Sequence, residues 1–554
     1  MSPTPPSSTL GALLAAGLGT FIVLAVFGTG IVPPGATGWM LSGQLGPDPV
    51  QYWLGWTYFR NAPWGMPPGA NPDFGMELAS SVFYADAIPL LAFLFKALRG
   101  VFEVGQYWGI WLLACGALQG WLAWRLIGRF TEAPLARLAG AMLFVLQPIL
   151  LNRMGGHFAL SAHFLLLWGL WFAITGAGTW RWMALTLAAS LIHSYLLPMV
   201  LGLWVADWWR RRAVAEALLV PAAGLLGLWA AGFFMLRAGH GGAMYGGMQL
   251  DLLAPFDPSH WGAFLPALPD TGHPEVNGSY LGLGALLLLP FLAWARPARW
   301  PGWQHWPLLA VLLAMLAFAI THRPSIGGAQ ITLIPLPAQL VELLGALRAS
   351  ERFFWPLAYA AMLAGIAGLL RLLGPRLGGV ALLALVLVQA ADLRPGMARL
   401  AHFFPPTPAE VPLRLNDPIW AELATHYRAI RAVPAANQGP GWEEIAVFAA
   451  RHGLATDAIY LARSDAGQVA ALRAATAARL AEGRPEPGVL YVLRDAESLA
   501  LAEDGLRPGQ DRLIRANGLI VLAPDWPVTN ALCLTKRKTS PPLGAAQAPG
   551  DTRC

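Results

Sequence analysis

Asp48 is the residue of this sequence best placed to do acid–base chemistry. It stands in the polar stretch Gly46-Pro47-Asp48-Pro49, between the first two apolar segments, and an aromatic-rich run from Gln51 to Trp56 follows it. Asp is a favoured N-cap residue and Pro suits the first turn of a helix, so this stretch predicts a helix start. The segment is predicted to be amphipathic and to lie flat on a membrane surface. A carboxylate there can also remove a proton from a hydroxyl group, and we predict that Asp48 is a catalytic general base.

A second carboxylate, Asp86, precedes Pro89 at the mouth of the next apolar segment. An ionisable group at membrane depth is costly and by default marks a functional site, although a carboxylate that merely reaches interfacial water is an alternative. If Asp48 and Asp86 face one cavity, one activates an acceptor hydroxyl and the other positions a group or holds a divalent cation. The cation stays open, because no metal-ligand motif accompanies the two aspartates.

Three histidines lie near the predicted membrane spans: His157, His163 and His193. Polar groups inside a helical bundle often only form hydrogen bonds between helices, which is the alternative to a role in the site. His163 and His193 are candidates for substrate binding, together with Gln51 and Tyr52 of the first polar stretch. His157 falls in a loop that the order of the spans places on the opposite side of the membrane.

Two long loops supply three further candidates for substrate binding. Glu275 and Asn277 lie near the end of a loop, residues 238–279, that is long enough to cover a cavity as a lid; ordinary solvated residues are the alternative. Arg352 precedes a span on the predicted outer side, where arginine is disfavoured, so its presence there needs another reason. Bidentate binding of a lipid phosphate is one such reason, and a salt bridge to Glu351 is another.

The elements that must position these residues are membrane-spanning helices. Apolar residues make up 56% of the chain and charged residues only 12%, whereas soluble domains carry roughly 25% charged residues. A bilayer core of about 30 Å needs about 20 apolar residues per helix. Eleven segments are candidate spans: 9–32, 82–99, 107–127, 134–151, 158–176, 182–206, 214–237, 280–295, 305–322, 353–373 and 378–392. The net charge of +6 does not point to nucleic acid, because basic residues cluster at the ends of apolar runs.

Loop charge predicts the orientation of these spans. The basic residues assigned to the cytoplasmic side are Lys96, Arg99, Arg153, Arg210, Arg211, Arg212, Arg296, Arg299, Arg371 and Arg376. The loops 33–81, 238–279 and 323–352 then lie on the outer side, together with the C-terminal part. Four arginines contradict this order, namely Arg125, Arg129, Arg137 and Arg181. The first apolar stretch is longer than the core of a signal peptide and is predicted to be retained as a span.

The composition changes after residue 400, where Pro405-Pro406 mark a boundary. We predict a membrane domain over 1–399, a soluble α/β domain over 400–538 and a disordered tail over 539–554. The α/β domain is expected to contain strands at Ala458–Ala462 and Val489–Leu493, a helix at Gln468–Ala481 and a hairpin at Leu513–Leu522, which turns at Asn517-Gly518. The sequence has no Gly-rich phosphate loop, which argues against a nucleotide-driven pump.

Several long motifs resemble an uncharacterised family of bacterial multi-pass membrane proteins, carried as a domain of unknown function. They cover nearly the whole chain and include G-P-D-P-V-Q-Y-W-L-G-W, S-S-V-F-Y-A-D-A-I-P-L, G-G-H-F-A-L-S-A-H, L-I-H-S-Y-L-L, N-G-S-Y-L-G-L-G and R-A-S-E-R-F-F-W-P. The layout is similar to the GT-C superfamily of polyprenyl-phosphate-sugar-dependent glycosyltransferases. That superfamily has an acidic residue in its first outer loop, a second near the start of the second span and often an exported C-terminal domain. Asp48 and Asp86 match these positions, but the usual pair of adjacent acidic residues is absent, since Pro flanks Asp48 on both sides.

The resemblance implies a GT-C-like, all-α polytopic membrane bundle of about 11 transmembrane helices, with a small soluble α/β C-terminal domain in the periplasm and the bundle in a bacterial inner membrane. It also implies a hexosyl- or pentosyltransferase that passes a sugar from a polyprenyl-phosphate donor to a glycan, lipid or protein acceptor of the cell envelope. Asp48 is then the base, Arg352 holds the leaving phosphate, and Asp86 and Glu275 shape the acceptor site. Two other classes stay open: a transporter or flippase for lipid-linked glycans, and a non-catalytic envelope assembly protein. No nucleic-acid partner is expected.

Overall fold

The computed structural model describes residues 6–236, 244–269, 278–295 and 306–526, and the chain divides into two compact units. Unit 1 comprises Met1–Ala70 and Ser81–Val411, and unit 2 comprises Asn71–Ser80 and Pro412–Cys554. The division at Val411 lies close to the predicted boundary, but the sequence did not indicate that Asn71–Ser80 belongs with the C-terminal part. The predicted tail over 539–554 lies outside the described residues.

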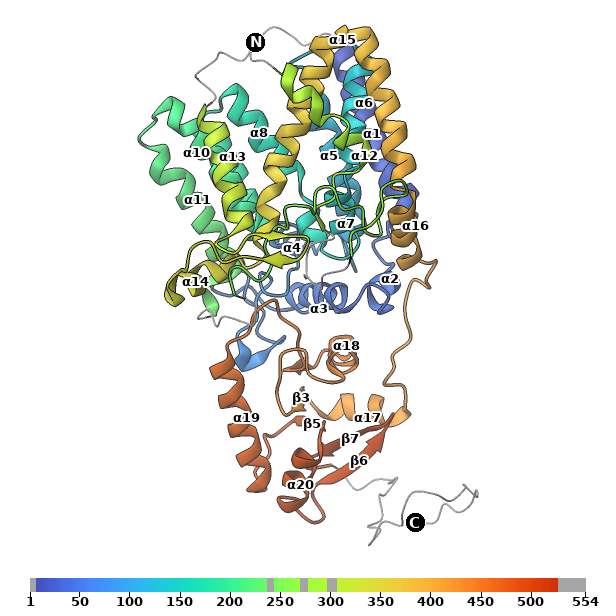
Figure 1. Ribbon diagram of the computed structural model, residues 1–554. Coiled ribbons are helices and arrows are strands. Elements are labelled where there is room, and N and C mark those ends of the chain that lie inside the picture. The colour runs from blue at the N-terminus through green and yellow to red at the C-terminus, as the bar shows by residue number, and fades with distance from the viewer. Residues whose placement is uncertain (1–5, 237–243, 270–277, 296–305, 527–554) are drawn as a thin grey trace. The chain divides into compact units, whose positions relative to one another are not determined.

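Unit 1 is helical, and most of its longer helices run side by side while α3 crosses them at one end (Figure 1). Its α-helices are α1 (Pro6–Phe27), α2 (Gly38–Leu41), α3 (Pro47–Asn61), α4 (Pro89–Ala97), α5 (Trp108–Ile127), α6 (Pro134–Val145), α7 (Pro148–Met154), α8 (Phe164–Thr175), α9 (Thr179–Ile192), α10 (Leu196–Arg211), α11 (Glu216–Ala231), α12 (Leu283–Leu286), α13 (Trp306–Ile320), α14 (Ala338–Leu344), α15 (Trp355–Asp392) and α16 (Arg394–Phe403). Short 3-10 helices are η2 (Phe158–Ser161), η3 (Phe233–Met235), η5 (Leu289–Trp294), η7 (Gly345–Leu347) and η8 (Ser350–Phe354), and the strands β1 (Ser325–Ile326) and β2 (Ala329–Gln330) form a hairpin.

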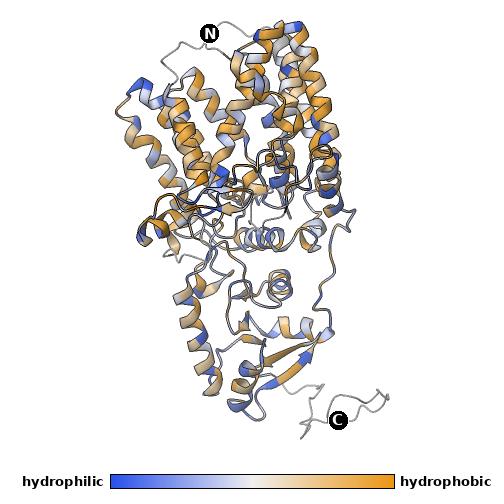
Figure 2. Cartoon of the chain, viewed as in Figure 1, coloured by the Kyte–Doolittle hydropathy of each residue, from blue (hydrophilic) through white to orange (hydrophobic). Residues whose placement is uncertain are grey.

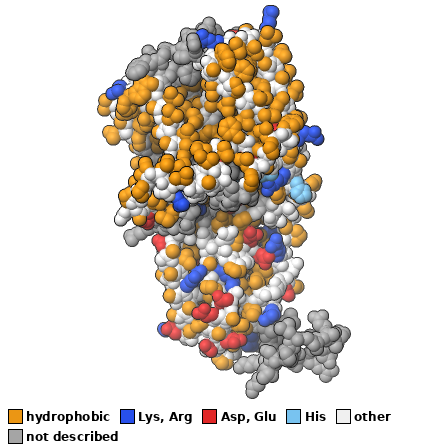
Figure 3. Space-filling view, in the orientation of Figure 1, with side chains coloured by type: hydrophobic (Ala, Val, Ile, Leu, Met, Phe, Trp, Pro, Cys, Tyr) orange, Lys and Arg blue, Asp and Glu red, His pale blue; other side chains and the backbone are white. Residues whose placement is uncertain are grey.

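Four helical stretches among the described residues are long and apolar enough to cross a membrane: Thr9–Phe27, Trp108–Ile127, Phe158–Thr175 and Ser350–Asp392. The helices α6 and α7, bent by 51° at their junction, make a fifth if they are taken as one span. Apolar residues dominate the helices of unit 1 and its visible surface (Figures 2 and 3). The eleven continuous spans predicted from the sequence are therefore not found in the described part of the chain.

Breaks in the helices account for most of this difference. The predicted span 82–99 contains only α4, because the residues before it form turns in which Asp86 and Ile88 have positive φ values of 50° and 49°. The predicted span 182–206 divides at His193 into α9 and α10. The predicted spans 353–373 and 378–392 both fall on α15, and the non-helical backbone of Gly374 before Pro375 (φ 74°, ψ 171°) divides this stretch into two helices between them. A hydropathy average does not register such changes, because they depend on the backbone conformation of single residues.

The helices α1 and α5 pack closely because glycines face each other where they meet. A β-carbon on Gly19 would lie 2.1 Å from the backbone oxygen of Gly116, and one on Gly116 would lie 2.7 Å from that of Gly19. Small residues at such a crossing let two backbones approach, as is common in membrane helix pairs. Gly17 lies on the same helix, but a β-carbon there would meet nothing within 4 Å.

One end of unit 1 carries α3 and the turn before α4, and we call it the carboxylate end because Asp48 and Asp86 lie there. Lys96 and Arg99 belong to this end, since their side chains donate to the backbone oxygens of Pro63 (3.4 Å) and Arg60 (2.7 Å). The sequence-based order of loops placed both cations opposite the first loop. That prediction is wrong, because α4 is too short to carry the chain across the unit.

The other end carries the connections α5–α6, α8–α9 and α10–α11, and we call it the arginine end. Arg125 of α5 lies over the ring of Trp171 of α8, 4.9 Å from its centroid. Arg210 of α10 donates to the backbone oxygen of Ala173, also in α8. The C-terminal ends of these three helices therefore lie together. The four arginines that contradicted the predicted order are at this end with Arg210, Arg211 and Arg212 (the Arg210 group), and the contradiction disappears.

Unit 2 is an α/β fold with a five-stranded mixed sheet of order β4-β3-β5-β7-β6. The strand β3 (Ala429–Val433) pairs in parallel with β4 (Ala455–Thr456) and β5 (Val489–Leu493). The strand β7 (Leu519–Ala523) runs antiparallel to both β5 and β6 (Arg512–Ala516). The helices are α17 (Pro418–His426), α18 (Trp442–His452), α19 (Ala466–Ala481) and α20 (Ala496–Asp504), with the 3-10 helix η1 (Met76–Leu78).

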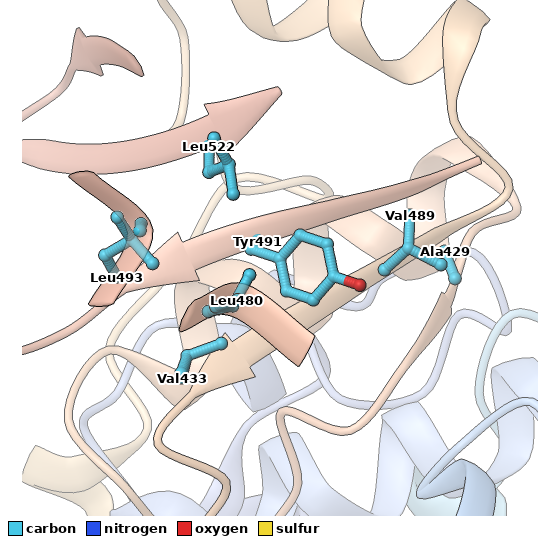
Figure 4. Packing of buried hydrophobic residues seen from close by; sticks show 8 residues of the cluster. Ala429, Val433, Leu480, Val489, Tyr491, Leu493 and Leu522 are labelled. Atoms are coloured by element: carbon cyan, nitrogen blue, oxygen red, sulfur yellow. The ribbon is translucent and has the colours of Figure 1, made fainter. Parts of the chain in front are cut away.

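The core of unit 2 lies between the sheet and its helices (Figure 4). Every residue of β3 and β5 is buried, which is typical of strands covered on both faces. The strand at Val489–Leu493 and the hairpin that turns at Asn517-Gly518 are confirmed, and α19 begins slightly earlier than predicted. The strand predicted at Ala458–Ala462 is wrong. The nearest strand, β4, ends at Thr456, and Ile459 makes only an isolated bridge.

Candidate functional site

Two carboxylate–imidazole pairs lie at the carboxylate end of unit 1. Oδ2 of Asp48 is 3.3 Å from Nε2 of His157, and Oδ1 of Asp86 is 4.0 Å from Nε2 of His193. The four side chains come from α3, the turn before α4, the turn after α7 and the break between α9 and α10. Sequence reasoning placed His157 on the opposite side of the membrane. The structure corrects this, because α4 does not cross the unit and α6 with α7 then brings the chain back to the end that carries Asp48.

The helix α3 holds three of the predicted site residues. Asp48 lies in its first turn, where the helix N-terminus stabilises negative charge. The amide of Gln51 donates to the backbone oxygen of Tyr84 (2.7 Å), and the hydroxyl of Tyr52 donates to that of Gly156 (3.0 Å). Gln51 thus ties α3 to the turn that carries Asp86, and Tyr52 ties it to the turn that carries His157. All residues from Pro49 to Phe59 are buried, so both faces of α3 are covered by protein.

Asp86 lies outside the helices that are long enough to span a membrane, in a turn where its φ is 50°. Such a conformation is costly for a residue other than glycine and is frequent at functional sites. Burial, and then the charge of Asp48, raise the pKa of Asp86 to about 7, while Arg352 and a hydrogen bond from Tyr52 act in the opposite direction. The Asp86 side chain therefore exchanges its proton near neutral pH, in a way that depends on the charge of Asp48.

Two buried arginines, Arg352 and Arg153, lie close enough for their charges to act on the pair of Asp86 and His193. Arg352 lies on η8, is only 7% exposed, and places its guanidinium carbon 4.7 Å from the centroid of the Tyr195 ring. The Tyr195 hydroxyl accepts a hydrogen bond from the backbone of Ala349, which fixes the start of η8. The preceding residue, Glu351, forms a buried ion pair with Arg153, with 3.3 Å between Nη2 and Oε1.

The other predicted residues have different positions. His163 is fully buried, its Nδ1 lies 2.7 Å from the Tyr359 hydroxyl, and its ring is 4.3 Å from that of Trp355. This is the geometry of the interhelical alternative, since both partners belong to α15. Glu275 and Asn277 lie outside the described residues. Sequence reasoning missed His157, Arg153 and Tyr195 as site residues, although Gly155-Gly156 before His157 signals a turn.

The described residues contain no group of three or more His, Cys, Asp or Glu side chains that could hold a metal ion. Asp48 and Asp86 each face one imidazole instead. The arrangement offers a carboxylate base with an imidazole beside it, a second carboxylate that titrates near neutral pH, and a buried guanidinium whose charge acts on that second carboxylate. These groups suit proton transfer from a hydroxyl next to an anionic ligand.

Fold and site together define a multi-helix protein that has apolar spans, a polar cluster at one end of its helices and a small appended α/β unit. Residues 16–394 match the family model described as domain of unknown function DUF6311, and residues 419–524 match the DUF6311 C-terminal domain. The first match covers more than half of the chain, and the protein belongs to this family of unknown function. No curated protein matches the chain.

Proposed function

We propose that this protein is a membrane glycosyltransferase that moves a sugar from a polyprenyl-phosphate donor to a hydroxyl group of a cell-envelope acceptor. The observation that carries the proposal is the pairing of Asp48 with His157 beside Asp86, His193 and the buried Arg352. A base for the acceptor hydroxyl, a second carboxylate that positions the acceptor and a cation beside the leaving phosphate suit such a transfer.

In the proposed reaction the acceptor oxygen attacks the anomeric carbon of the sugar. Asp48 takes the hydroxyl proton, and His157 stabilises the protonated pair. The bond between the anomeric carbon and the phosphate oxygen breaks, its electron pair leaves with the polyprenyl phosphate, and the anomeric centre inverts. Arg352 balances the charge of the leaving phosphate. Asp86, held by His193, positions the acceptor, and Glu275 and Asn277 remain candidates for the acceptor side.

We further propose that the carboxylate end faces the outer side of a bacterial inner membrane and that unit 2 is periplasmic. The support is the charge of the short connections at the arginine end, which carry Arg125, Arg129, Arg137 and Arg181 with the Arg210 group. Basic residues in short loops favour the cytoplasm, whereas long loops cross largely regardless of their charge. This orientation agrees with a lipid-linked donor that enters from the bilayer.

The test is sugar transfer by the purified protein in lipid vesicles. The probes are synthetic polyprenyl-phosphate monosaccharides with a radiolabelled hexose or pentose, offered with lipid and glycan extracts of the cell envelope as acceptors. We expect the wild type to transfer label and Asp48→Asn to be slower by about 10²–10⁴-fold, the usual contribution of a general base. Asp73→Asn is the matched control, since Asp73 is an exposed aspartate of the same stretch between α3 and α4.

Two outcomes contradict the proposal. If Asp48→Asn transfers sugar as fast as Asp73→Asn does, Asp48 is not the catalytic base. Movement of labelled lipid across the vesicle without transfer, unaffected by Asp48→Asn, favours a lipid-glycan transporter.

A further inference from the structure

Arg431 is a buried cation in the sheet of unit 2. It lies on β3, its side chain is 1% exposed, and three carboxylates surround it. Asp457 and Glu486 lie 3.1 Å from its guanidinium nitrogens, and Glu77 accepts two hydrogen bonds, at 2.6 and 3.0 Å. A buried guanidinium needs such partners, because removal of one leaves charge without compensation.

Glu77 belongs to the loop between α3 and α4, far in sequence from the other members of this cluster. Backbone hydrogen bonds join the same segment to β4: Gly75 donates to Thr456 (2.8 Å), and Thr456 donates to Asp73 (2.9 Å). Phe74 and Thr456 form a parallel bridge, and Met76 packs against the core of the unit. Asn71–Ser80 is therefore an added edge of the sheet in unit 2, although the chain enters it from unit 1.

The chain leaves unit 1 and returns to it at one narrow point. Ala70 and Ser81 form an antiparallel bridge, and Asn71 donates to the backbone oxygen of Ser80 (3.0 Å). The returning residues lead directly into the turn of Asp86, whose strained φ leaves it little freedom to adjust. The contacts that bind Asn71–Ser80 within unit 2 therefore restrict the movement of the start of this turn.

We propose that Glu77 and Arg431 are positioning residues for Asp86, so that unit 2 sets the conformation of one carboxylate of the site. The role of Asp86 in a reaction rests on the proposed function, whereas the control of its turn by the ion pair does not rest on it. The C-terminal unit then has a role in the site even though it contributes none of the paired carboxylates or imidazoles.

Hydrogen exchange of the full-length protein in lipid nanodiscs tests the positioning role. Glu77→Ala is expected to raise amide exchange by about tenfold, both in residues 72–80 and in the Asp86 turn, residues 82–87, because it removes two charge-assisted hydrogen bonds. Glu77→Gln, which keeps the shape, is expected to give a smaller rise. Glu482→Ala is the matched control, since Glu482 pairs with Arg484 at the surface of the same unit. Exchange that rises only in 72–80, or in neither segment, overturns the proposal.

A second readout separates positioning from general loosening. In an active preparation, Glu77→Ala is expected to move the limb of the pH–rate profile near pH 7 toward lower pH, because a freer Asp86 is better solvated. An unmoved limb overturns the proposal. If the wild type transfers no sugar, only the proposed function fails, and the exchange experiment still decides the positioning role.

Discussion

Nε2 of His157 lies 3.3 Å from Oδ2 of Asp48, which joins the turn after α7 to the first turn of α3. This contact places the two residues at the same end of unit 1, where hydropathy and loop charge had separated them. Other contacts reverse the sides assigned to Lys96 and Arg125. The short connections α5–α6, α8–α9 and α10–α11 then lie at one end with their arginines, whereas Arg99 lies at the carboxylate end.

Cysteine labelling in intact cells tests the proposed orientation. Met66, at the carboxylate end, and Val214, at the arginine end, are 83% and 84% exposed, so they form a matched pair. We expect Met66→Cys to react with an impermeant maleimide from outside and Val214→Cys to react only after permeabilisation. Cys533 and Cys554 are replaced by Ser in both, and Cys115 is buried. The reverse pattern excludes a site that faces the periplasm.

We expect Asp86 to make the protein less stable as the pH rises. Its pKa is about 7 in the folded protein, compared with about 3.9 in an unfolded chain. Between these values only the folded state keeps the proton, so the contribution of Asp86 to stability is greatest below about pH 4 and is lost as pH rises to about 7. The groups that act on Asp86 are Asp48, Arg352, Tyr52 and His193.

Thermal unfolding in nanodiscs at pH 5 and pH 8 checks this prediction. The side chain of Asp86→Asn is neutral at both pH values. From pH 5 to pH 8 the Tm of this variant should therefore decrease less than that of the wild type. The difference corresponds to at most about 3 kcal/mol, because about two pH units separate pH 5 from the pKa of Asp86 and each is worth about 1.4 kcal/mol. Equal decreases for both proteins contradict the assigned pKa.

The glycine contact between α1 and α5 predicts a position-specific loss of stability. Gly19→Val places its side chain against the backbone of Gly116 and should cost about 1–3 kcal/mol or more, as overpacking does. Gly17→Val, two residues earlier, meets open space and should leave Tm nearly unchanged. If the two variants lose stability equally, the loss is caused by helix propensity and not by the packing of α1 against α5.

The buried pair of Arg153 and Glu351 predicts strong coupling in a double-mutant cycle. Glu351→Gln leaves the Arg153 charge buried and should destabilise unit 1 by about 3–5 kcal/mol. Arg153→Met combined with Glu351→Gln removes that charge and should recover part of the loss. Thermal unfolding of the four proteins measures the coupling, and additive losses contradict a direct pair.

The sequence by itself indicated candidate site residues and a change of composition near residue 400. Asp48 in the first loop, Asp86 before a Pro-Leu-rich segment and Arg352 before a span were found from residue type and local context. The C-terminal strand Val489–Leu493 and the hairpin after it were predicted because their signals are local: a run of apolar β-formers and an Asn-Gly turn.

Only the tertiary structure decided which groups meet. Whether an apolar segment crosses the unit or turns back depends on the φ of single residues such as Asp86 and Gly374, and this choice changes the side of every later loop. The pairing of Asp48 with His157, of Glu351 with Arg153, and of Glu77 with Arg431 joins residues more than 100 positions apart in the chain. No local pattern records such contacts, because the free energy that holds them comes from burial and charge compensation in the folded chain.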